Sequence, residues 1–289
     1  MRVLITGSGG QVGRALTACA PSGAQVVALR RDQLDVGERH AVISALQTHR
    51  PDVIFNAAAY TAVDRAEDEP ELAVRVNAEG PAHLAQAAHR TGARLIHIST
   101  DFVFDGGSSV PYPPDAPTAP LNIYGASKQA GEQAVLAALP DRSVVVRTAW
   151  VYAAEGHNFL RTMLRLMTTT GSVRVVADQV GSPTAARSVA QVLWALLDHP
   201  EVAGVHHWTD AGVASWYDFA VAIAEEAFAA GRLASEPQVV PIATSEYPTR
   251  ARRPAYSVLD RSSLSRVLGA VPTHWRKSLR LVIGELRNA

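Results

Sequence analysis

The chain has 289 residues and a hydrophobic content of 47%, which is enough for one large domain or for a core domain with a smaller lobe. Its 27 basic and 27 acidic side chains balance, so we expect no attraction to nucleic acid or to an anionic membrane surface. The single cysteine, Cys19, excludes an internal disulfide and a cysteine-rich metal site, and we expect no metal. The short apolar start does not have the form of a signal peptide, and no stretch has the length of a membrane span, so we expect a cytoplasmic protein.

The chain begins with a short apolar strand, a glycine-rich turn and a helix. Val3–Ile5 predicts a buried strand, and residues 14–20 predict a helix. This order is the context that a dinucleotide-binding fingerprint requires. One glycine would permit the tight turn, one would let the backbone approach the pyrophosphate, and one would let the helix pack against the strand. These glycines are Gly7, Gly10 and Gly13.

The end of the second strand carries information on the cofactor. An acidic residue after Gln25–Leu29 would bind the ribose 2′-hydroxyl of NAD, but Arg30 and Arg31 stand there. Guanidinium groups suit a 2′-phosphate, so we expect NADPH and assign Arg30 to it. Asp32 could still reach a ribose, which keeps NADH as the alternative. The adenine edge is expected at Asp35 and Val36.

Two further strands are expected to reach the same edge of the sheet. Residues 51–55 predict a strand that delivers Ala57, Ala58 and Ala59, whose small side chains would let a flat cofactor lie against the backbone. A single long helix is expected from Val63 to His89, with the amide of Asn77 supporting a neighbouring backbone. Residues 94–98 predict the next strand, and the hydroxyl and carboxyl groups that follow it can reach the same crevice.

A tyrosine and a lysine one helical turn apart form the strongest catalytic pattern. Tyr124 and Lys128 would share one face of a helix. Lys128 and Lys277 are the only lysines of the chain, which argues against a chance pairing. A nearby ammonium would lower the pKa of the phenol toward the working pH, where acid–base catalysis is most effective. The Gly-, Ser- and Pro-rich loop of residues 104–120 is expected to cover this site.

The second half predicts a smaller lobe. Trp150 follows a strand expected over residues 143–148, and its indole could stack on a sugar ring. Residues 185–197 predict a helix that returns to cover the sheet, and 205–208 predict a strand. Three arginines at positions 250, 252 and 253 could meet a diphosphate, although a solvated loop remains an equal alternative. Residues 264–286 are expected to be helical.

Taken together, these motifs resemble the dTDP-4-dehydrorhamnose reductases of the extended short-chain dehydrogenase/reductase superfamily. The matching segments cover essentially the whole chain and include Thr6-Gly-x-x-Gly-x-x-Gly13, Asn56-Ala-Ala-Ala59, Ser99-Thr-Asp101, Tyr124-x-x-x-Lys128, Asp178-Gln-Val-Gly-Ser-Pro-Thr184 and Arg253-Pro254.

The resemblance implies a role for each matching residue. Tyr124 would donate a proton to the C4 carbonyl of the sugar, Lys128 would bind the nicotinamide ribose, and Thr100 would hydrogen-bond the carbonyl oxygen. The other cofactor contacts it implies are Gln11, Val12 and Thr61. The other substrate contacts it implies are Asp101, Trp150, Asn158 and Arg253.

We therefore predict an α/β fold with a Rossmann-type doubly wound parallel sheet and a smaller C-terminal lobe. The cofactor domain would span 1–149 with 185–208 returning to it, and the substrate lobe 150–184 and 209–289. The expected activity is NAD(P)H-dependent reduction of dTDP-4-dehydro-L-rhamnose by a monomer or homodimer. The alternatives are a reductase of another dTDP-4-keto-6-deoxy sugar, from an antibiotic pathway, and a non-catalytic regulatory subunit of a methionine adenosyltransferase on the same fold.

Overall fold

A parallel six-stranded sheet forms the centre of the larger part of the molecule in this computed structural model, which describes residues 1–286. The strand order is β10-β5-β4-β3-β1-β2, and every pair in it is parallel. The next strand in sequence after β1, β2, lies on one side of β1, and the strand after that, β3, lies on its other side. The switch point of the doubly wound sheet therefore lies between β1 and β3. The predicted fold class is confirmed. The strands are β1 (Arg2–Thr6), β2 (Gln25–Leu29), β3 (Val53–Asn56), β4 (Arg94–Thr100), β5 (Ser143–Thr148) and β10 (Gly204–His207).

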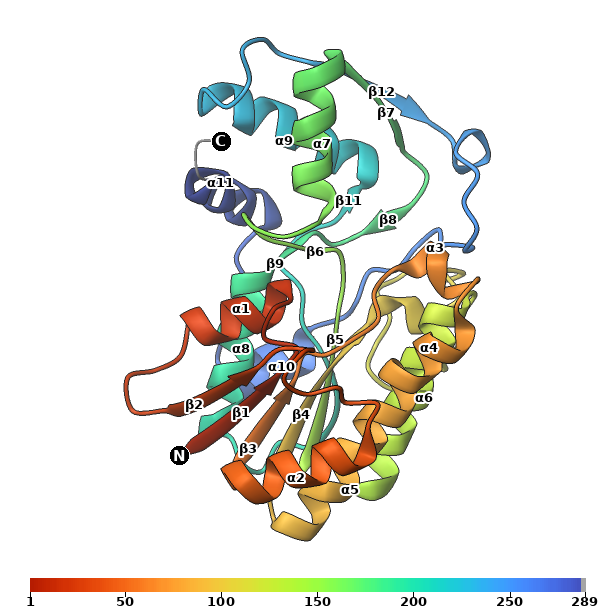
Figure 1. The fold of residues 1–289 in the computed structure, drawn as a ribbon. Coiled ribbons are helices and arrows are strands. Elements are labelled where there is room, and N and C mark those ends of the chain that lie inside the picture. Colours follow the sequence, from red (N-terminus) through yellow and green to blue (C-terminus); the bar gives the residue numbers. More distant parts are fainter. Residues whose placement is uncertain (287–289) are drawn as a thin grey trace.

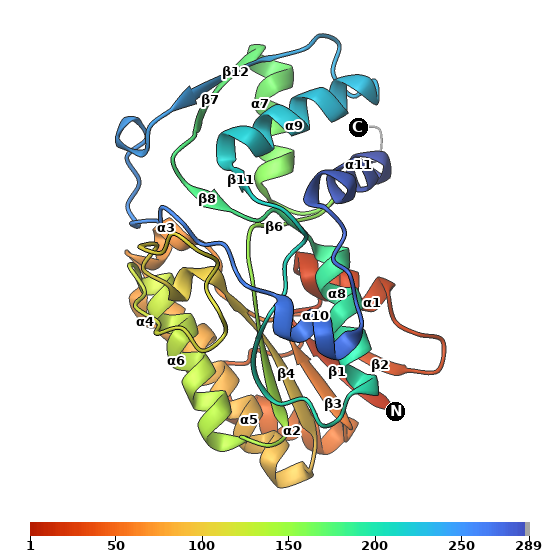
Figure 2. The ribbon, with the colours of Figure 1, turned by 180° about the vertical axis from the view of Figure 1, so that it is seen from behind.

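Helices cover both faces of this sheet, as Figures 1 and 2 show. Alternate side chains of each strand point to opposite faces, so neighbouring positions belong to separate apolar clusters. Ile5 and Phe55 pack with α1 and α8, whereas Leu4 and Ile54 pack with α2, α5 and α6. One face of the sheet is covered by α1 (Gln11–Ala18) and α8 (Ala186–Ala195). The opposite face is covered by α2 (Arg39–His49), α5 (Gly80–Thr91) and α6 (Ile123–Ala138).

The segment expected to form one long helix from Val63 to His89 is interrupted, so that expectation is wrong. Pro70 opens a new helix because it has no N–H to continue the previous one. A π-helical turn then contains Asn77, whose amide exchanges hydrogen bonds with the backbone of Tyr60 at 2.8 and 3.0 Å, as expected for a supporting role. The elements are α3 (Val63–Ala66), α4 (Pro70–Val74), η1 (Arg75–Glu79) and α5.

The C-terminal segment also differs from the single helical stretch expected over 264–286. Gly269 has a left-handed backbone with φ of 58°, and Pro272 follows, so the chain turns between α10 (Ser262–Leu268) and α11 (Trp275–Glu285). Leu264 of α10 joins the apolar cluster of the main sheet, whereas α11 packs in the smaller lobe. The last three residues of the expected substrate lobe lie outside the described residues.

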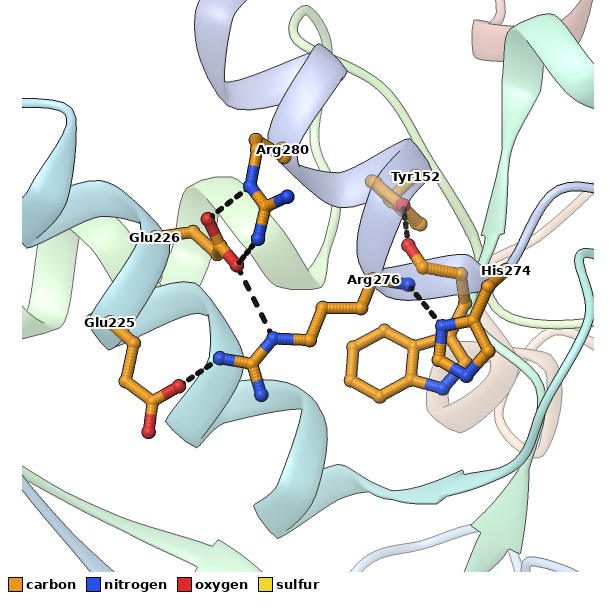
Figure 3. A network of polar contacts seen from close by, with 7 residues as sticks. Tyr152, Glu225, Glu226, His274, Arg276 and Arg280 are labelled. Carbon is orange, nitrogen blue, oxygen red and sulfur yellow. Dashed lines mark hydrogen bonds and ion pairs between the residues drawn. The ribbon is translucent and has the colours of Figure 1, made fainter.

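The smaller lobe has its own apolar core, built around Tyr152, Phe219 and Trp275. Three short strand pairs frame it, β6 with β9, β8 with β11, and β7 with β12. Ion pairs join its helices α9 and α11, with Arg276 contacting Glu225 and Glu226, and Arg280 contacting Glu226 (Figure 3). The elements are β6 (Val151–Tyr152), α7 (Phe159–Thr170), β7 (Ser172–Val176), β8 (Val180–Gly181), β9 (Thr184–Ala185), β11 (Ala214–Ser215), α9 (Trp216–Ala229) and β12 (Gln238–Ile242), besides α11.

The loop of residues 104–120 packs away from the expected position. Phe104 stacks on Tyr112 with ring centroids 4.2 Å apart, and Leu259 completes this small cluster. Among residues 1–286, the lining of the cleft described below includes Phe102 but none of 104–120, so the expectation that this loop covers the site is wrong. Three 3₁₀ turns complete the chain, η2 (Asp101–Val103), η3 (Leu196–Asp198) and η4 (Thr244–Glu246). Within residues 1–286, no helix combines the length and the apolar character that crossing a bilayer requires.

Candidate active site

Two adjoining cavities lie at the carboxyl ends of the sheet strands. One has a volume of about 350 Å³ and the other of about 570 Å³. The smaller is bounded by the turn after β1 and by the end of β2, whereas the larger extends between the sheet and the smaller lobe. Residues common to both linings make them one continuous cleft, and these are Gly9, Gly10, Ala57, Ala59 and Thr61.

The glycine turn fits a dinucleotide because it packs too closely for any side chain. Gly7 has φ of 66°, and a Cβ there would lie 2.5 Å from the backbone nitrogen of Ala58. A Cβ on Gly13 would lie 2.3 Å from the carbonyl oxygen of Gly7, which explains the close approach of α1 to β1. Gly10 precedes α1, whose first turn receives no side-chain cap. Free N–H groups at a helix start are the groups that a phosphate satisfies.

Most of the expected cofactor residues line this cleft, with two exceptions. Gly13 lies beneath the turn, and Arg30 lines neither cavity; its guanidinium lies on the surface, 3.5 Å from the carboxylate of Asp32. Arg31 lines the smaller cavity instead. The expected residues that do line the cleft are Gly7, Gly10, Gln11, Val12, Asp35, Val36, Ala57, Ala58, Ala59, Thr61, Tyr124 and Lys128.

Helix α6 brings Tyr124 and Lys128 to the larger cavity. The side chain of Asn122 caps the helix by accepting from the N–H of Gly125 at 2.8 Å. Gly125 has no room for a side chain, because a Cβ would lie 2.2 Å from the carbonyl oxygen of Phe102. The start of α6 is therefore held against the turn after β4, which carries Thr100, and all three functional groups line the same cavity.

Tyr124 is kept in its protonated form by its surroundings. Burial raises the pKa of the phenol to about 12, a hydrogen bond with Thr100 lowers it, and the nearby Asp101 carboxyl raises it. The lowering by Lys128 that the sequence suggests is not among these causes. A phenol in this state is a proton donor at neutral pH.

Lys128 faces the sheet in this structure. Its ammonium nitrogen donates to the carbonyl oxygen of Ile98 at 2.7 Å and lies 3.5 Å from Nε2 of His97. Burial lowers the pKa of Lys128 to about 8, while the negative charge of Glu132 raises it. Burial thus brings the pKa of this lysine below that of an exposed lysine.

Asp101 lies beside the hydroxyl of Thr100, which donates to it at 3.1 Å. Burial raises the pKa of Asp101 to about 6, and hydrogen bonds from Ser257 and Thr100 lower it. Both Thr100 and Asp101 line the larger cavity, and their contact with a substrate stays a prediction.

Two stacked indoles form the wall of the cavity on the side of the smaller lobe. Trp150 and Trp216 have ring centroids 3.5 Å apart and planes within 4° of parallel. Trp150 has a left-handed backbone with φ of 48°, which is rare for a bulky residue. Gly181 makes room for its ring, since a Cβ there would lie 2.5 Å from the indole. Sequence reasoning missed Trp216, although an aromatic pair directly after the Ser215 cap was an available signal.

The other two expected substrate residues line the cavity but have protein partners. Arg253 forms a two-point ion pair with Asp64, at 2.7 and 3.1 Å. Its neighbour in the cluster, Arg250, pairs with Asp68. Asn158 caps α7 and donates to the side chain of Gln11 at 2.9 Å, which links the smaller lobe to the glycine turn.

A doubly wound sheet with a glycine turn at its switch point and a Tyr-x-x-x-Lys pair at its open edge defines a short-chain dehydrogenase/reductase. Comparison with known proteins narrows this class. Residues 1–288 match the family described as the RmlD substrate binding domain, and the chain belongs to that family.

Individual relatives agree over nearly the full length. A dTDP-4-dehydrorhamnose reductase of Aggregatibacter actinomycetemcomitans is 41% identical, over 96% of this chain and 97% of that protein. A probable dTDP-4,6-dihydroxy-2-methyloxan-3-one 4-ketoreductase of Streptomyces antibioticus is 45% identical, over 97% and 94%. The crystal structure of a Bacillus anthracis dTDP-4-dehydrorhamnose reductase in complex with NADP superposes with a TM-score of 0.91 at 36% identity, over 98% and 99%.

Proposed function

We propose that this protein uses NADPH to reduce the C4 keto group of dTDP-4-dehydro-L-rhamnose, giving dTDP-L-rhamnose for deoxysugar biosynthesis. The observation that carries the proposal is the convergence of Thr100, Tyr124 and Lys128 on one cavity that continues into the glycine turn, in a chain of this family. The names of the relatives support the same activity.

Each group has a defined task in this reaction. When bound, a reduced nicotinamide supplies the hydride that the carbonyl carbon receives. Thr100 and Tyr124 hydrogen-bond the carbonyl oxygen, and Tyr124 gives it a proton, so the C4 carbonyl becomes a hydroxyl group that stays on the sugar. Lys128 would hold the nicotinamide ribose when the cofactor is bound, and the Trp150–Trp216 stack offers a flat apolar surface to the C–H face of the sugar.

The smaller cavity favours NADPH over NADH. Arg31 lines it and can meet a 2′-phosphate, whereas Arg30 lies outside its lining. The neighbour that was solved with NADP supports this choice. NADH remains the alternative through Asp32, which follows the same strand, β2. Asp35 also lines the cavity, but its carboxylate pairs with Arg75 at 3.2 Å and accepts from the N–H of Gly37 at 2.9 Å.

We assign residues 1–149 and 185–208 to cofactor binding, and 150–184 with 209–286 to substrate binding, except α10, which packs with the sheet. We further propose that the protein works in the cytoplasm as a monomer or homodimer, without nucleic-acid or membrane partners. Size-exclusion chromatography with light scattering tests the assembly state, and a tetramer would contradict the proposal.

The Streptomyces antibioticus relative supports a second candidate, reduction of a different dTDP-4-keto-6-deoxy sugar. Substrate profiling with several dTDP-4-keto sugars, followed by identification of each product, separates the two. A regulatory role on a methionine adenosyltransferase has less support, since Thr100, Tyr124 and Lys128 are all present at the cavity.

The direct test is oxidation of NADPH by dTDP-4-dehydro-L-rhamnose with wild type and Tyr124→Phe. We expect the variant to lose at least about 100-fold in kcat, the usual effect of removing a general acid, and to bind NADPH nearly as well. Tyr217→Phe, which removes a hydroxyl from a tyrosine outside the cleft lining, is the matched control. Full turnover by Tyr124→Phe would contradict the mechanism.

A further inference from the structure

A row of buried polar side chains crosses the apolar sheet and ends at Lys128. Thr6, Asn56 and His97 lie on the neighbouring strands β1, β3 and β4, and each is in register with the next. All three side chains are fully buried. The hydroxyl of Thr6 donates to Oδ1 of Asn56 at 2.7 Å, and Nδ2 of Asn56 lies 3.0 Å from Nδ1 of His97. Polar groups in a sheet core stabilise poorly compared with apolar ones, so this row calls for another explanation.

The hydrogen bonds of the row fix where the proton of His97 lies. The backbone N–H of Ala58 can only donate, and it donates to Oδ1 of Asn56 at 3.2 Å. This contact sets the orientation of the amide, so its Nδ2 must be the group that donates to His97. Nδ1 of His97 is therefore an acceptor without a proton. The single proton of the neutral ring is on Nε2, 3.5 Å from the nitrogen of Lys128.

An N–H group that faces Lys128 opposes its ammonium form. An ammonium has only donors, whereas a neutral amine has a lone pair that can accept from Nε2–H. The second contact of Lys128, with the carbonyl oxygen of Ile98, suits both forms because both can donate.

We propose that Asn56 and His97 are positioning residues that fix the place of the Lys128 nitrogen and favour its uncharged form, so that this lysine can exchange a proton within the working pH range. The inference deepens the proposed reductase function and rests on it for its catalytic meaning.

Other charged groups near Lys128 act in known directions. Glu132 lies one turn further along α6 and favours the ammonium, but Arg147 of β5 neutralises it through a two-point ion pair. Asp101, on η2, raises the pKa of Tyr124 and is not among the groups that shift the pKa of Lys128. The segment η1 contributes Asn77, which is uncharged and donates to Ser127. Burial and Lys128 together hold the pKa of His97 well below its usual range, which agrees with a neutral ring.

The protonation state of Lys128 can be measured without any assay of activity. The chain has only two lysines, so protein labelled with ¹³C at the lysine ε carbon gives two signals, and the exposed Lys277 serves as the internal reference. Titration of the full chain, with and without NADPH, follows Lys128 directly. Spectra of ¹⁵N-labelled histidine show which ring nitrogen of His97 carries the proton.

Two variants test the direction of the effect. His97→Phe removes the opposing N–H, so Lys128 should titrate about one pH unit higher, the shift that one ordinary hydrogen bond produces. Asn56→Asp places an acceptor at Nδ1, which moves the ring proton to Nδ1 and turns Nε2 into an acceptor, and it should raise the pKa of Lys128 by at least as much. The matched control is His206→Phe on the edge strand β10, which removes a partly buried imidazole whose Nε2 contacts the carbonyl oxygen of Ala203 at 3.1 Å.

We expect both variants to raise the pH at which Lys128 titrates and to shift the corresponding limb of the pH–kcat profile, while His206→Phe moves neither. A wild-type spectrum with the proton on Nδ1, or a folded His97→Phe whose Lys128 signal titrates as in wild type, would overturn the proposal. If His97→Phe does not fold, Asn56→Asp and the wild-type spectrum decide. Failure to reduce the keto sugar would count against the proposed function alone, because the NMR results do not depend on turnover.

Discussion

The buried ion pair between Glu132 and Arg147 gives a stability prediction that the structure makes quantitative. Both side chains are at most 5% exposed, and the guanidinium donates to the two carboxylate oxygens at 2.9 and 2.7 Å. Arg147 also donates to the carbonyl oxygen of Pro114 at 3.2 Å and lies over the ring of Phe104. Glu132→Gln keeps the volume but leaves the arginine charge buried and unbalanced.

Because no cavity forms, we expect the lower end of the range for a broken buried pair, a loss of about 3 kcal/mol in the free energy of unfolding. For a chain of 289 residues, with an entropy of unfolding of about 0.6 kcal/mol/K, that corresponds to a fall in Tm of about 5 °C. Urea-induced unfolding followed by tryptophan fluorescence measures the change.

The exposed pair of Arg30 and Asp32 provides the matched control. Its side chains are 63% and 69% exposed, so Asp32→Asn should cost less than about 1 kcal/mol. The double variant Glu132→Leu with Arg147→Met should regain much of the lost stability, because it removes both charges. A Glu132→Gln protein within about 1 kcal/mol of wild type would refute the reasoning, since it would mean that water reaches the arginine.

Three further outcomes are expected. Arg31→Ala should weaken NADPH binding about tenfold, as expected for the loss of one charge-assisted hydrogen bond, and should have little effect on NADH binding. A fluorescence titration that shows equal losses for both cofactors would count against a 2′-phosphate contact. Trp216→Ala should remove the ring that supports Trp150, and KM for the sugar should then rise about tenfold. The exciton signal of the stacked indoles should disappear from the circular dichroism spectrum. An unchanged KM would exclude a role of the Trp150–Trp216 stack in sugar binding. The pKa of Asp101 is raised from 3.8 to about 6, so the folded state binds the proton more tightly and loses stability as pH rises through that window. Asp101→Asn should therefore be more stable than wild type by up to about 3 kcal/mol at neutral pH, and this gain should disappear below about pH 4. Urea unfolding at several pH values measures the gain. A gain that does not depend on pH would show that the Asp101 carboxyl does not titrate in this range.

The parts of the molecule that are coded locally could be predicted from the sequence. The strand before Gly7 and the spacing of Tyr124 and Lys128 are visible in short windows, because strand period, turn chemistry and helix pitch all act over a few residues. The break at Pro70 could have been predicted as well, since a proline that follows polar residues commonly opens a new helix.

Contacts between distant segments could not be predicted. The strands β6 and β9 have two residues each, too few for any periodic pattern. The stack of Trp150 on Trp216 depends on the packing of α9, and the pairing of Arg253 with Asp64 depends on how the smaller lobe meets α3. The orientation of Lys128 toward His97 likewise arises from the register of the sheet, so the sequence suggested only its proximity to the phenol.

The path of the chain between the two lobes has a consequence for how such enzymes diversify. After β5 the chain enters the smaller lobe, returns to supply α8 and β10, leaves again for α9, returns as α10 and ends in α11. A cut at residue 149 would strip the sheet of an edge strand and of the helix that covers α1. The smaller lobe is thus built from separate stretches of the chain, so an exchange at one crossover point could not replace it without also removing part of the sheet.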